Sequence, residues 1–488
     1  MAVADSRPAT VFGRQAIWYR HLAWWLLALA VMRGLQVLAS DPMLAIANNY
    51  DMIRVQACVD AWPVRDGTIP PAANSPAAPL ERFRFVDGVD APCFMTSEAL
   101  FAWVAWPGMW MEQALRADRT FSIRWKGALQ FSLWIAIAAW CTRRLLALQR
   151  SDLAAGHAVV AAVAVVDPAN LLYFNTFYAE SSAVLFLYAV LAGILVAVAE
   201  GGVTRRWLIV AIGVAAILLA LTKIQHLLVP LVVFVCVVVA TAIGRLRLRL
   251  LSGVLAAGAL LGVSAQWLHM NAESNGSNRS ANLVDTLFTA LLPNSGEPEV
   301  LLSRLGLPAS CTEQSGSSWY SPGMVSRTLC PEVFALDQVD LIVAALRDPA
   351  MGGRTMLAGM DHARSWIPEG IGVMEGGDFA RLPATVPSLS PAIAAVSPSA
   401  LLALICILPA VSLVLVALRR SADQVPANAV VLALGVLPLC IYVTAVLGDG
   451  YVDLSKHFHL GISALVAALV VMACLLFDRV FRRLDGRR

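Results

Sequence analysis

Long apolar runs divide this chain, and polar stretches of very unequal length separate them. The runs lie near 21–40, 127–142, 154–171, 180–199, 207–222, 227–244, 250–269, 394–418, 428–447 and 458–477. A run of about 20 apolar residues is long enough to cross a bilayer as a helix. The pattern therefore predicts an all-α polytopic membrane protein with about ten transmembrane helices.

Arginines mark alternate turns between these runs. Basic residues precede the first run and recur in every second turn, at Arg7, Arg14, Arg20, Arg143, Arg144, Arg205, Arg206, Arg245, Arg247, Arg249, Arg419, Arg420, Arg479, Arg482 and Arg483. Positive charge collects on the cytoplasmic side of membrane proteins, so we expect these turns and both termini to be cytoplasmic. The other turns, 41–126, 167–180, 223–226, 270–393 and 448–457, then face outward.

Two of the outward turns are large. We therefore divide the chain into a transmembrane module over 1–269, an extracytoplasmic cap over 270–393, and C-terminal transmembrane helices over 394–488. The first large loop, 41–126, contains the Pro/Ala-rich "AWPVRDGTIPPAANSPAAP" and then the aromatic "SEALFAWVAWPGMWMEQAL". The second stretch predicts a juxtamembrane helix lying in the interface. The alternative is a short span, which would reverse the sidedness of every later turn.

Composition supports a membrane protein and excludes a nucleic-acid binder. The 488 residues are 59% hydrophobic and 14% charged, with a net charge of +3, whereas a soluble protein carries about 25% charged residues. The mean hydropathy is +0.70. No basic tract interleaved with aromatic residues is present, so no nucleic-acid surface is expected.

Cysteine positions agree with the proposed sidedness. Cys58 and Cys93 lie in the first outer loop, and Cys311 and Cys330 lie in the second. Each loop can therefore close one disulfide in an oxidising compartment. The other five cysteines lie in the apolar runs or at their ends, and no His/Cys spacing indicates a zinc site.

The chain has only three lysines, and all three fall on the outer side, at Lys126, Lys223 and Lys456. Lys223 lies in "LTKIQH", with Gln225 and His226, and Lys456 precedes His457 in "GDGYVDLSKHFHL". The cytoplasmic turns use arginine alone. A compact ammonium group binds phosphate as a point charge, so these lysines are candidate phosphate ligands.

Carboxylates gather on the same side. Asp51 lies in "ANNYDMIRV" with Arg54, and Asp167 in "VVDPANLL". Glu180 follows Asn175 and Tyr178 in "YFNTFYAESS", and Asp449 and Asp453 belong to "GDGYVDLSKHFHL". Ionisable groups near a membrane cost several kcal/mol unless they pair or line a wet cavity. We expect one shared polar cavity on the outer face.

Simpler interpretations exist for several of these residues. Asp51 and Arg54 are one helical turn apart and can form a local ion pair, as can Asp453 and Lys456. Lys223 can extend its ammonium group to lipid headgroups.

Carboxylates, lysines and a lipid-facing wall suit a substrate with a polyprenyl tail, a phosphate and a sugar. The motifs "NNYDMIRV", "YFNTFYAESS", "LTKIQH" and "GDGYVDLSKHFHL", in this order, resemble those of GT-C fold glycosyltransferases that use polyprenyl-phosphate sugars. The closest similarity is to the multi-spanning hexose transferases of bacterial surface-glycan synthesis. The resemblance runs from Asp51 to His457.

The resemblance implies roles for individual residues. Asp51 would be the catalytic base, and Asp167 the second acidic site, with Glu180, Asn175 and Tyr178 on the acceptor side. The donor phosphate would be bound by Lys223, Gln225, His226, Lys456 and His457, with Arg54, Asp449 and Asp453 in support. Metal-dependent members carry paired acids such as Asp-x-Asp, whereas Asp51 and Asp167 stand singly. The motif therefore requires no cofactor. A divalent metal ion could still bind if Asp51, Asp167 and Glu180 lie close together in the folded protein.

The expected activity is an inverting glycosyl transfer (EC 2.4 class). A hexose would pass from a polyprenyl-phosphate donor to a lipid-linked or surface glycan acceptor, at the periplasmic face of a bacterial inner membrane. One alternative is a transporter or flippase of lipid-linked sugars, but transporters place polar groups at the midplane within internal repeats, and no repeat is found here. Another is an O-antigen-type ligase or polymerase, for which we expect arginines, more than lysines, at the donor phosphate.

Overall fold

The computed structural model describes residues 11–47, 50–64, 78–89, 93, 94, 96–201, 205–246, 248–272 and 276–485. The sequence predictions that fall on Arg7, Arg247 and residues 65–77 of the Pro/Ala-rich stretch lie outside this set. Every apolar run corresponds to a helix. These helices are α1 (Val11–Leu38), α4 (Arg124–Ala147), α5 (Ser151–Val160) with the π-helical turn η1 (Ala161–Val165), α7 (Glu180–Ala199), α8 (Arg206–Ala220), α9 (Val229–Ile243), α10 (Arg249–Met270), α16 (Pro398–Leu418), α17 (Val425–Asp449) and α19 (His459–Asp485).

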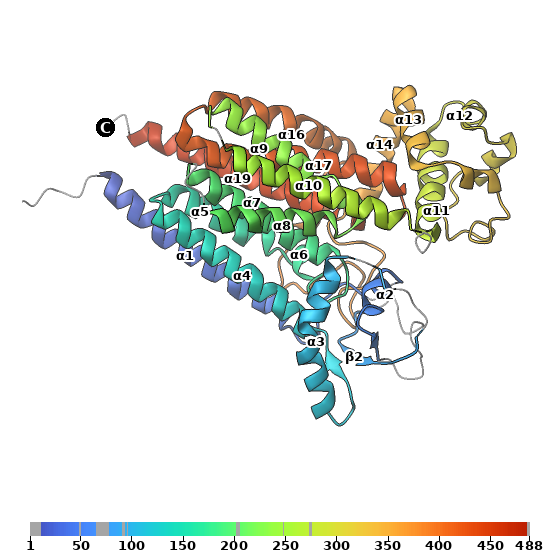
Figure 1. The fold of residues 1–488 in the computed structure, drawn as a ribbon, viewed down its shortest axis with the longest axis horizontal. Coiled ribbons are helices and arrows are strands. Elements are labelled where there is room, and N and C mark those ends of the chain that lie inside the picture. The colour runs from blue at the N-terminus through green and yellow to red at the C-terminus, as the bar shows by residue number, and fades with distance from the viewer. Residues whose placement is uncertain are drawn as a thin grey trace, which may run out of the picture.

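These helices form one elongated bundle (Figure 1). Within the described residues, seven helical segments are long and apolar enough to cross a membrane; they lie in α1, α7, α9, α10, α16, α17 and α19. The segments Ser151–Val165 and Arg206–Ala220 are apolar but shorter, and α4 is more polar at its ends. The prediction of a mostly helical membrane protein is confirmed, whereas the count of ten spans stays a prediction.

Burial separates the centre of the bundle from its lipid-facing rim. The helix α7 is buried along nearly its whole length, whereas Leu260 and Leu261 of α10 are about 60% exposed. The helices α8 and α10 pack closely because a Cβ atom on Gly258 would lie 2.8 Å from the carbonyl oxygen of Gly213. Small residues allow such contact between helices where lipid offers no hydrophobic driving force.

The first large loop, 41–126, also contains three short strands, which the all-α prediction did not include. It contains α2 (Tyr50–Gln56), α3 (Glu98–Leu115) and the strands β1 (Ala61–Pro63), β2 (Arg82–Phe85) and β3 (Phe121–Ser122). The strands form an antiparallel sheet in the order β1-β2-β3. Ala61 pairs with Phe85, and Phe83 pairs with Phe121. Strands of two to four residues leave too little alternation to be recognised in a sequence.

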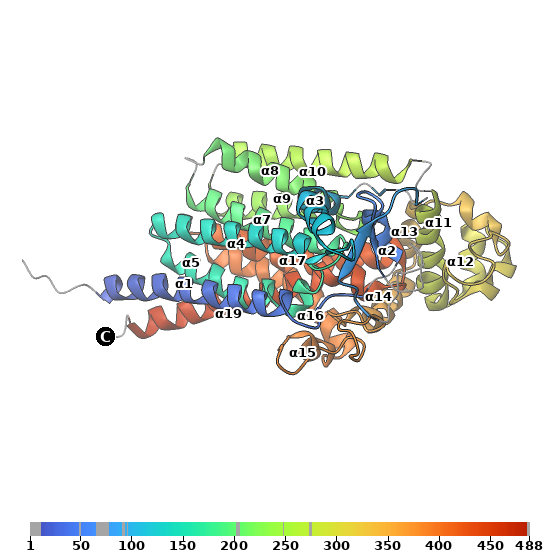
Figure 2. The same ribbon diagram turned by 90° about the horizontal axis from the view of Figure 1, so that it is seen from below.

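Helix α3 lies across the bundle direction. It runs nearly perpendicular to the bundle helices in Figure 1 and is seen almost end-on in Figure 2. Trp103, Trp106 and Trp110 are 51%, 41% and 54% exposed, while Phe101 and Met109 are buried. This geometry agrees with the predicted helix in the plane of the membrane interface.

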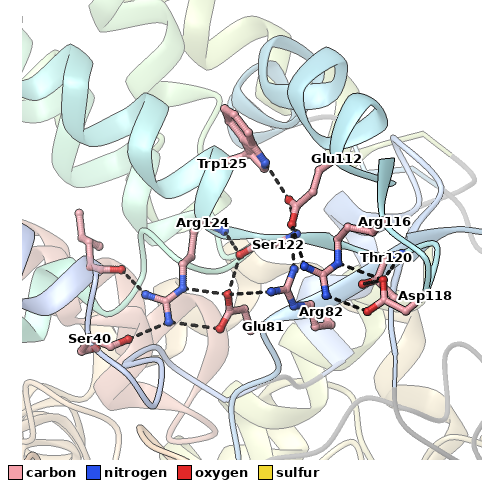
Figure 3. A network of polar contacts seen from close by, with 11 residues as sticks. Ser40, Glu81, Arg82, Glu112, Arg116, Asp118, Thr120, Ser122, Arg124 and Trp125 are labelled. Carbon is pink, nitrogen blue, oxygen red and sulfur yellow. Dashed lines mark hydrogen bonds and ion pairs between the residues drawn. The ribbon is translucent and has the colours of Figure 1, made fainter. Parts of the chain in front are cut away.

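A polar network anchors the far end of α3 to the sheet and to α4 (Figure 3). Glu112 accepts hydrogen bonds from Arg82 Nη1 (2.8 Å), Trp125 Nε1 (2.8 Å) and the Ser122 amide (2.9 Å). Arg124 pairs with Glu81 through its Nε at 3.0 Å. Glu112 therefore fixes the orientation of α3, while Glu81, the residue before β2, joins this strand to α4.

The cap follows α10 and precedes α16. It consists of α11 (Gly276–Val284), η4 (Asp285–Leu291), η5 (Leu292–Asn294), α12 (Pro298–Arg304), η6 (Ala309–Gln314), η7 (Pro331–Ala335), α13 (Gln338–Arg347), α14 (Pro349–Ala363) and α15 (Ser390–Ala394). Its first part has its own apolar core, which includes Phe288, Leu302 and Met324. The cap is joined to the end of α17 by Gln338, whose Nε2 donates to the Leu447 carbonyl (2.6 Å).

Both predicted disulfides are present. Cys58 and Cys93 are bonded at 2.10 Å, and Cys311 and Cys330 at 1.96 Å. The remaining five cysteines are free, as predicted: Cys141, Cys236, Cys406, Cys440 and Cys474. Four short elements complete the connections: α6 (Pro168–Leu171), η2 (Ile224–His226), η8 (Ala422–Gln424) and α18 (Leu454–His457).

Candidate functional site

Lys456 is the centre of an ionic cluster at the cap end of the bundle. It lies on α18, the single helical turn between α17 and α19, and its side chain is only 2% exposed. Its ammonium group donates to the Asp51 carboxylate and to Asp453 Oδ2, the latter at 2.7 Å. The backbone reaches this turn through positive φ angles at Gly450 (64°) and Asp453 (50°). The turn thus presents the ammonium group to α2.

Asp51 lies in the first turn of α2 and is 21% exposed. Its Oδ1 atom lies 3.5 Å from Arg54 Nη2. Burial acts to raise the pKa of Asp51, but Lys456, Arg54 and Lys223 outweigh burial and hold this pKa well below its ordinary value. The carboxylate therefore stays ionised over the whole physiological range.

A second ion pair lies beside the first. Lys223 donates to Glu180 Oε1 at 2.9 Å, with side-chain exposures of 13% and 2%. Glu180 is the first residue of α7, and Lys223 immediately precedes η2. The charge of Lys223 acts on Asp51, so both pairs belong to one cluster. The structure therefore brings Asp51, Lys223 and Lys456 together in one cluster, as the sequence predicted.

Asp449 and His457 form a third pair. Their Oδ2 and Nε2 atoms lie 2.5 Å apart, and Gln225 Nε2 lies 3.5 Å from the same carboxylate oxygen. With its amide oriented to satisfy both atoms, Asn282 of the cap donates to Asp449 Oδ1 at 3.0 Å. Several buried polar atoms here make no hydrogen bond within the described part of the chain, namely His457 Nδ1, Gln225 Oε1 and Glu180 Oε2. They leave hydrogen-bonding capacity for water or a ligand.

Three further predicted residues have mainly supporting contacts. Tyr178 is buried, with its hydroxyl 3.4 Å from the Ala47 carbonyl, and Lys456 Nζ lies 5.8 Å from its ring centroid. Asn175 Nδ2 donates to the Leu38 carbonyl at 3.2 Å, and His226 Nδ1 lies 2.8 Å from Thr222 Oγ1. Tyr178 thus borders the cluster directly, whereas Asn175 and His226 bond to the surrounding scaffold.

Asp167 is held in a different polar contact set. It caps α6 by accepting from the Ala169 amide (2.9 Å), and it lies 3.4 Å from Arg33 Nη2. It also accepts from Ser388 Oγ (2.6 Å) and the Leu389 amide (2.9 Å). These bonds join α1 and α6 to the segment before α15. Arg33, to which the sequence assigned no function, is therefore the cation paired with this buried acid.

The structure does not assemble Asp51, Asp167 and Glu180 into a metal site. Among the described residues, the one group of three potential ligands within mutual reach is Cys311, Cys330 and Glu332. Its two sulfur atoms form a disulfide, so they do not act as thiolate ligands.

Sequence reasoning missed a buried ion pair between α3 and α4. Glu98 and Lys126 are both fully buried and in direct contact. The Glu98 carboxylate also accepts from Gln130 Nε2 (3.0 Å), Ser181 Oγ (2.9 Å) and the Ser182 amide (3.2 Å). Burial raises the pKa of Glu98 above its ordinary value despite the pull of Lys126. The rarity of lysine marked Lys126, but no sequence signal identified its partner.

Residues of the Glu98 network directly neighbour residues of the ionic cluster in the sequence. Ser181 and Ser182 directly follow Glu180 at the start of α7. Thr96, two residues before Glu98, donates through its hydroxyl to the carbonyl of Thr222 (2.7 Å), the residue before Lys223. The network therefore fixes both backbone segments that carry the Lys223–Glu180 pair.

The chain matches a known family. A family model described as the YfdI N-terminal transmembrane domain matches residues 83–332. This range contains Glu98, Lys126, Glu180 and Lys223, whereas Asp51 and Lys456 lie outside it. Neither a search of curated proteins nor a search of solved structures finds a match.

Proposed function

Because the chain belongs to the family of the YfdI N-terminal transmembrane domain, whose model covers just over half of it, we propose that it is an inverting glycosyltransferase. The family supports a membrane glycosyltransferase-like protein. The finer proposal is that a hexose is transferred from a polyprenyl-phosphate donor to a lipid-linked or surface glycan.

The observation that carries the proposal is the contact of Lys456 with Asp51, beside the Lys223–Glu180 pair. An ammonium group has three N–H donors. Two of those on Lys456 are directed at Asp51 and Asp453, which leaves one for a phosphate oxygen. Lys223, with one carboxylate partner at 2.9 Å, supplies further donors. This arrangement suits a transfer reaction. The two lysines can bind the lipid phosphate that leaves, and the ionised carboxylate beside them can accept the proton of the attacking acceptor hydroxyl.

In the proposed reaction the acceptor oxygen attacks the anomeric carbon as the bond from that carbon to the phosphate oxygen breaks. The proton of the hydroxyl passes to Asp51, which acts as general base. The negative charge that grows on the polyprenyl phosphate is stabilised by Lys223 and Lys456. Attack from the face opposite the leaving group inverts the anomeric configuration.

Lys456 also couples donor binding to the basicity of Asp51. Lys456 and Arg54 hold the Asp51 pKa well below its ordinary value, and a carboxylate with so low a pKa is a weak base. A donor phosphate bound to Lys456 shares its positive charge and so weakens its pull on Asp51. Asp51 therefore becomes a better base when the donor is in place.

The other predicted residues are proposed in three groups. Gln225 and the Asp449–His457 pair, linked by short polar contacts, complete the donor-phosphate side. Glu180 and Tyr178 border the cluster and are placed toward the acceptor. We assign Asp167, Asn175 and His226 to holding the backbone around the site, because their polar contacts are to scaffold groups.

We place the site at the periplasmic face of a bacterial inner membrane. Both disulfides lie in the two outer loops, next to α2 and in the cap, at the same end of the bundle as the cluster (Figure 1). Disulfides persist in oxidising compartments and are rare in the cytosol. A cluster at one end of the bundle also favours transfer over transport, since transporters bind their substrates near the midplane.

The test is a radiolabelled transfer assay in proteoliposomes, with polyprenyl-phosphate hexoses as donors and with or without chelator. Asp51→Asn should lower transfer by about 100-fold or more, as for loss of a general base. The matched control is Asp60→Asn in the same loop, since Asp60 is exposed with a φ of 53°, which asparagine also adopts. Full activity of Asp51→Asn refutes the proposed base. Movement of the lipid-linked sugar across the bilayer without a new glycosidic bond identifies a transporter instead.

A further inference from the structure

A disulfide-closed segment of the cap is attached, through Asp285, to the turn that carries Lys456. The Cys311–Cys330 bond closes a stretch of 19 positions, and this stretch contains "SSWYSPG" at 317–323. Trp319 is 8% exposed, whereas its neighbour Tyr320 is 70% exposed. One aromatic side chain thus anchors the segment and the next is left in water.

The anchor is well defined. The Trp319 amide donates to Asp285 Oδ1 at 2.6 Å, and the Gly316 amide donates to the Phe288 carbonyl at 2.7 Å. The Trp319 and Phe334 rings meet edge-on with centroids 6.3 Å apart. These contacts fix the backbone of Tyr320 on the cap core.

The same anchor is joined to the turn that carries Lys456. A Cβ atom on Gly450 would lie 2.2 Å from the Asp285 carbonyl oxygen, so the two backbones are in close contact. The Tyr451 amide donates to Thr289 Oγ1 at 2.9 Å. Tyr320 is therefore held in a set position relative to α18 through Asp285.

The second link runs from α2, the helix that carries Asp51. Arg54 Nη2, on α2, donates to Asn278 Oδ1 of α11 at 3.1 Å. The cap is thus attached on both sides of the cluster, to α2 and to the α17–α18 turn. Figure 2 shows α2 next to α11.

Tyr320 lies in the electric field of the cluster. Although most of the Tyr320 side chain is exposed, partial desolvation by the surrounding chain raises the Tyr320 pKa; the Asp51 charge adds to this effect, while Lys456 and Arg54 oppose it. The Tyr320 hydroxyl therefore stays neutral and can both donate and accept a hydrogen bond. The ring face remains accessible from the water side.

We propose that Tyr320 is an acceptor-binding residue, and that the sugar ring receiving the new bond packs on its exposed face beside Asp51. The proposal rests on the glycosyltransferase function proposed above. A sugar has an apolar C–H face and a rim of hydroxyls, which match a ring with a polar tip. The position, on the cap and among charged groups, suits a saccharide better than a lipid chain.

The test compares Tyr320→Ala with Tyr320→Phe. The donor is a radiolabelled polyprenyl-phosphate hexose that the unsubstituted protein accepts, and the acceptor is the glycolipid fraction of the source cell's membranes, added at graded concentrations. Loss of the ring should raise the acceptor KM about tenfold, or about 1.4 kcal/mol, with the donor KM unchanged. Tyr320→Phe retains the ring and should stay within about threefold of the unsubstituted protein, since at most one neutral hydrogen bond at an exposed position is lost.

The matched control is Val325→Ala, on the same disulfide-closed segment and 57% exposed, which should leave both KM values unchanged. An unchanged acceptor KM for Tyr320→Ala overturns the proposal. So does an equal rise for Val325→Ala, because the segment would then act through its general shape. If the unsubstituted protein transfers no sugar from any hexose donor, the proposed function is wrong, and the assignment of Tyr320 is then wrong as well.

Discussion

Replacing Lys126 by methionine tests the buried pair beneath α3. Methionine keeps much of the volume and length of lysine but removes its charge. The change leaves the Glu98 carboxylate fully buried without its cation. We expect a large loss of stability, because an uncompensated buried charge is among the most costly defects in a folded protein.

The magnitude follows from what remains around Glu98. Removing one partner of a buried ion pair costs about 3–5 kcal/mol. The carboxylate keeps donors from Gln130 (3.0 Å), Ser181 (2.9 Å) and the Ser182 amide (3.2 Å), so the lower end applies. A loss of about 3 kcal/mol is roughly a hundredfold change in the unfolding equilibrium.

Acidic pH should partly rescue this variant. Burial already raises the pKa of Glu98, and loss of Lys126 removes the charge that opposes burial. A group whose pKa is raised on folding contributes stability below its unfolded pKa and loses that contribution as pH rises through its folded pKa. The deficit of Lys126→Met should therefore be largest near pH 8 and shrink toward pH 5.

The assay is unfolding of the detergent-solubilised protein by SDS titration, followed by tryptophan fluorescence at pH 5 and pH 8. The double variant Glu98→Gln with Lys126→Met removes both charges and should recover most of the loss. The control is Arg381→Met, which breaks the Arg381–Asp378 pair, 79% and 75% exposed, and should leave the midpoint unchanged. Equal stability of the unsubstituted protein and Lys126→Met at both pH values refutes the reasoning.

Two further predictions concern the contact between the cap and α18. Burial, with Asp449 and Asp453 nearby, raises the pKa of Asp285 to about 8, so its stabilising contribution is lost as pH rises from the unfolded pKa toward 8. Asp285→Asn should therefore unfold at a higher temperature than the unsubstituted protein at pH 8, and the difference should be much smaller at pH 5, as measured by differential scanning fluorimetry. Gly450→Ala places a Cβ atom 2.2 Å from the Asp285 carbonyl oxygen at a φ of 64°. It should cost about 1–3 kcal/mol and lower sugar transfer, whereas Gly448→Ala, whose Cβ atom meets nothing within 4 Å, should do neither.

The bundle was predictable because each transmembrane helix is encoded locally. A run such as 428–447 must satisfy its own backbone hydrogen bonds and present apolar side chains all round, so its identity as a helix needs no partner. The structure places α17 over Val425–Asp449. The tryptophans of α3 likewise predicted an interfacial helix without reference to the rest of the chain.

The sheet of the first loop was not predictable in this way. Strands β1 and β2 lie about 20 positions apart, and each depends on the other for its hydrogen bonds. Their short lengths give no alternation long enough to recognise. The partners of buried charges are also hard to predict from the sequence, because they lie far apart in the chain. Lys126 is paired with Glu98 across 28 positions, and Asp167 is paired with Arg33 across 134 positions.

The sequence by itself determined that Asp51, Glu180, Lys223 and Lys456 lie in turns beyond the ends of the apolar runs, because a charge is costly within the apolar layer. Only the tertiary structure decided that Lys456 contacts Asp51, that Lys223 contacts Glu180, and that Asp167 belongs to another contact set. The reason is that helix positions are set by local hydrophobicity, whereas the pairing of charges depends on how the helices pack against one another.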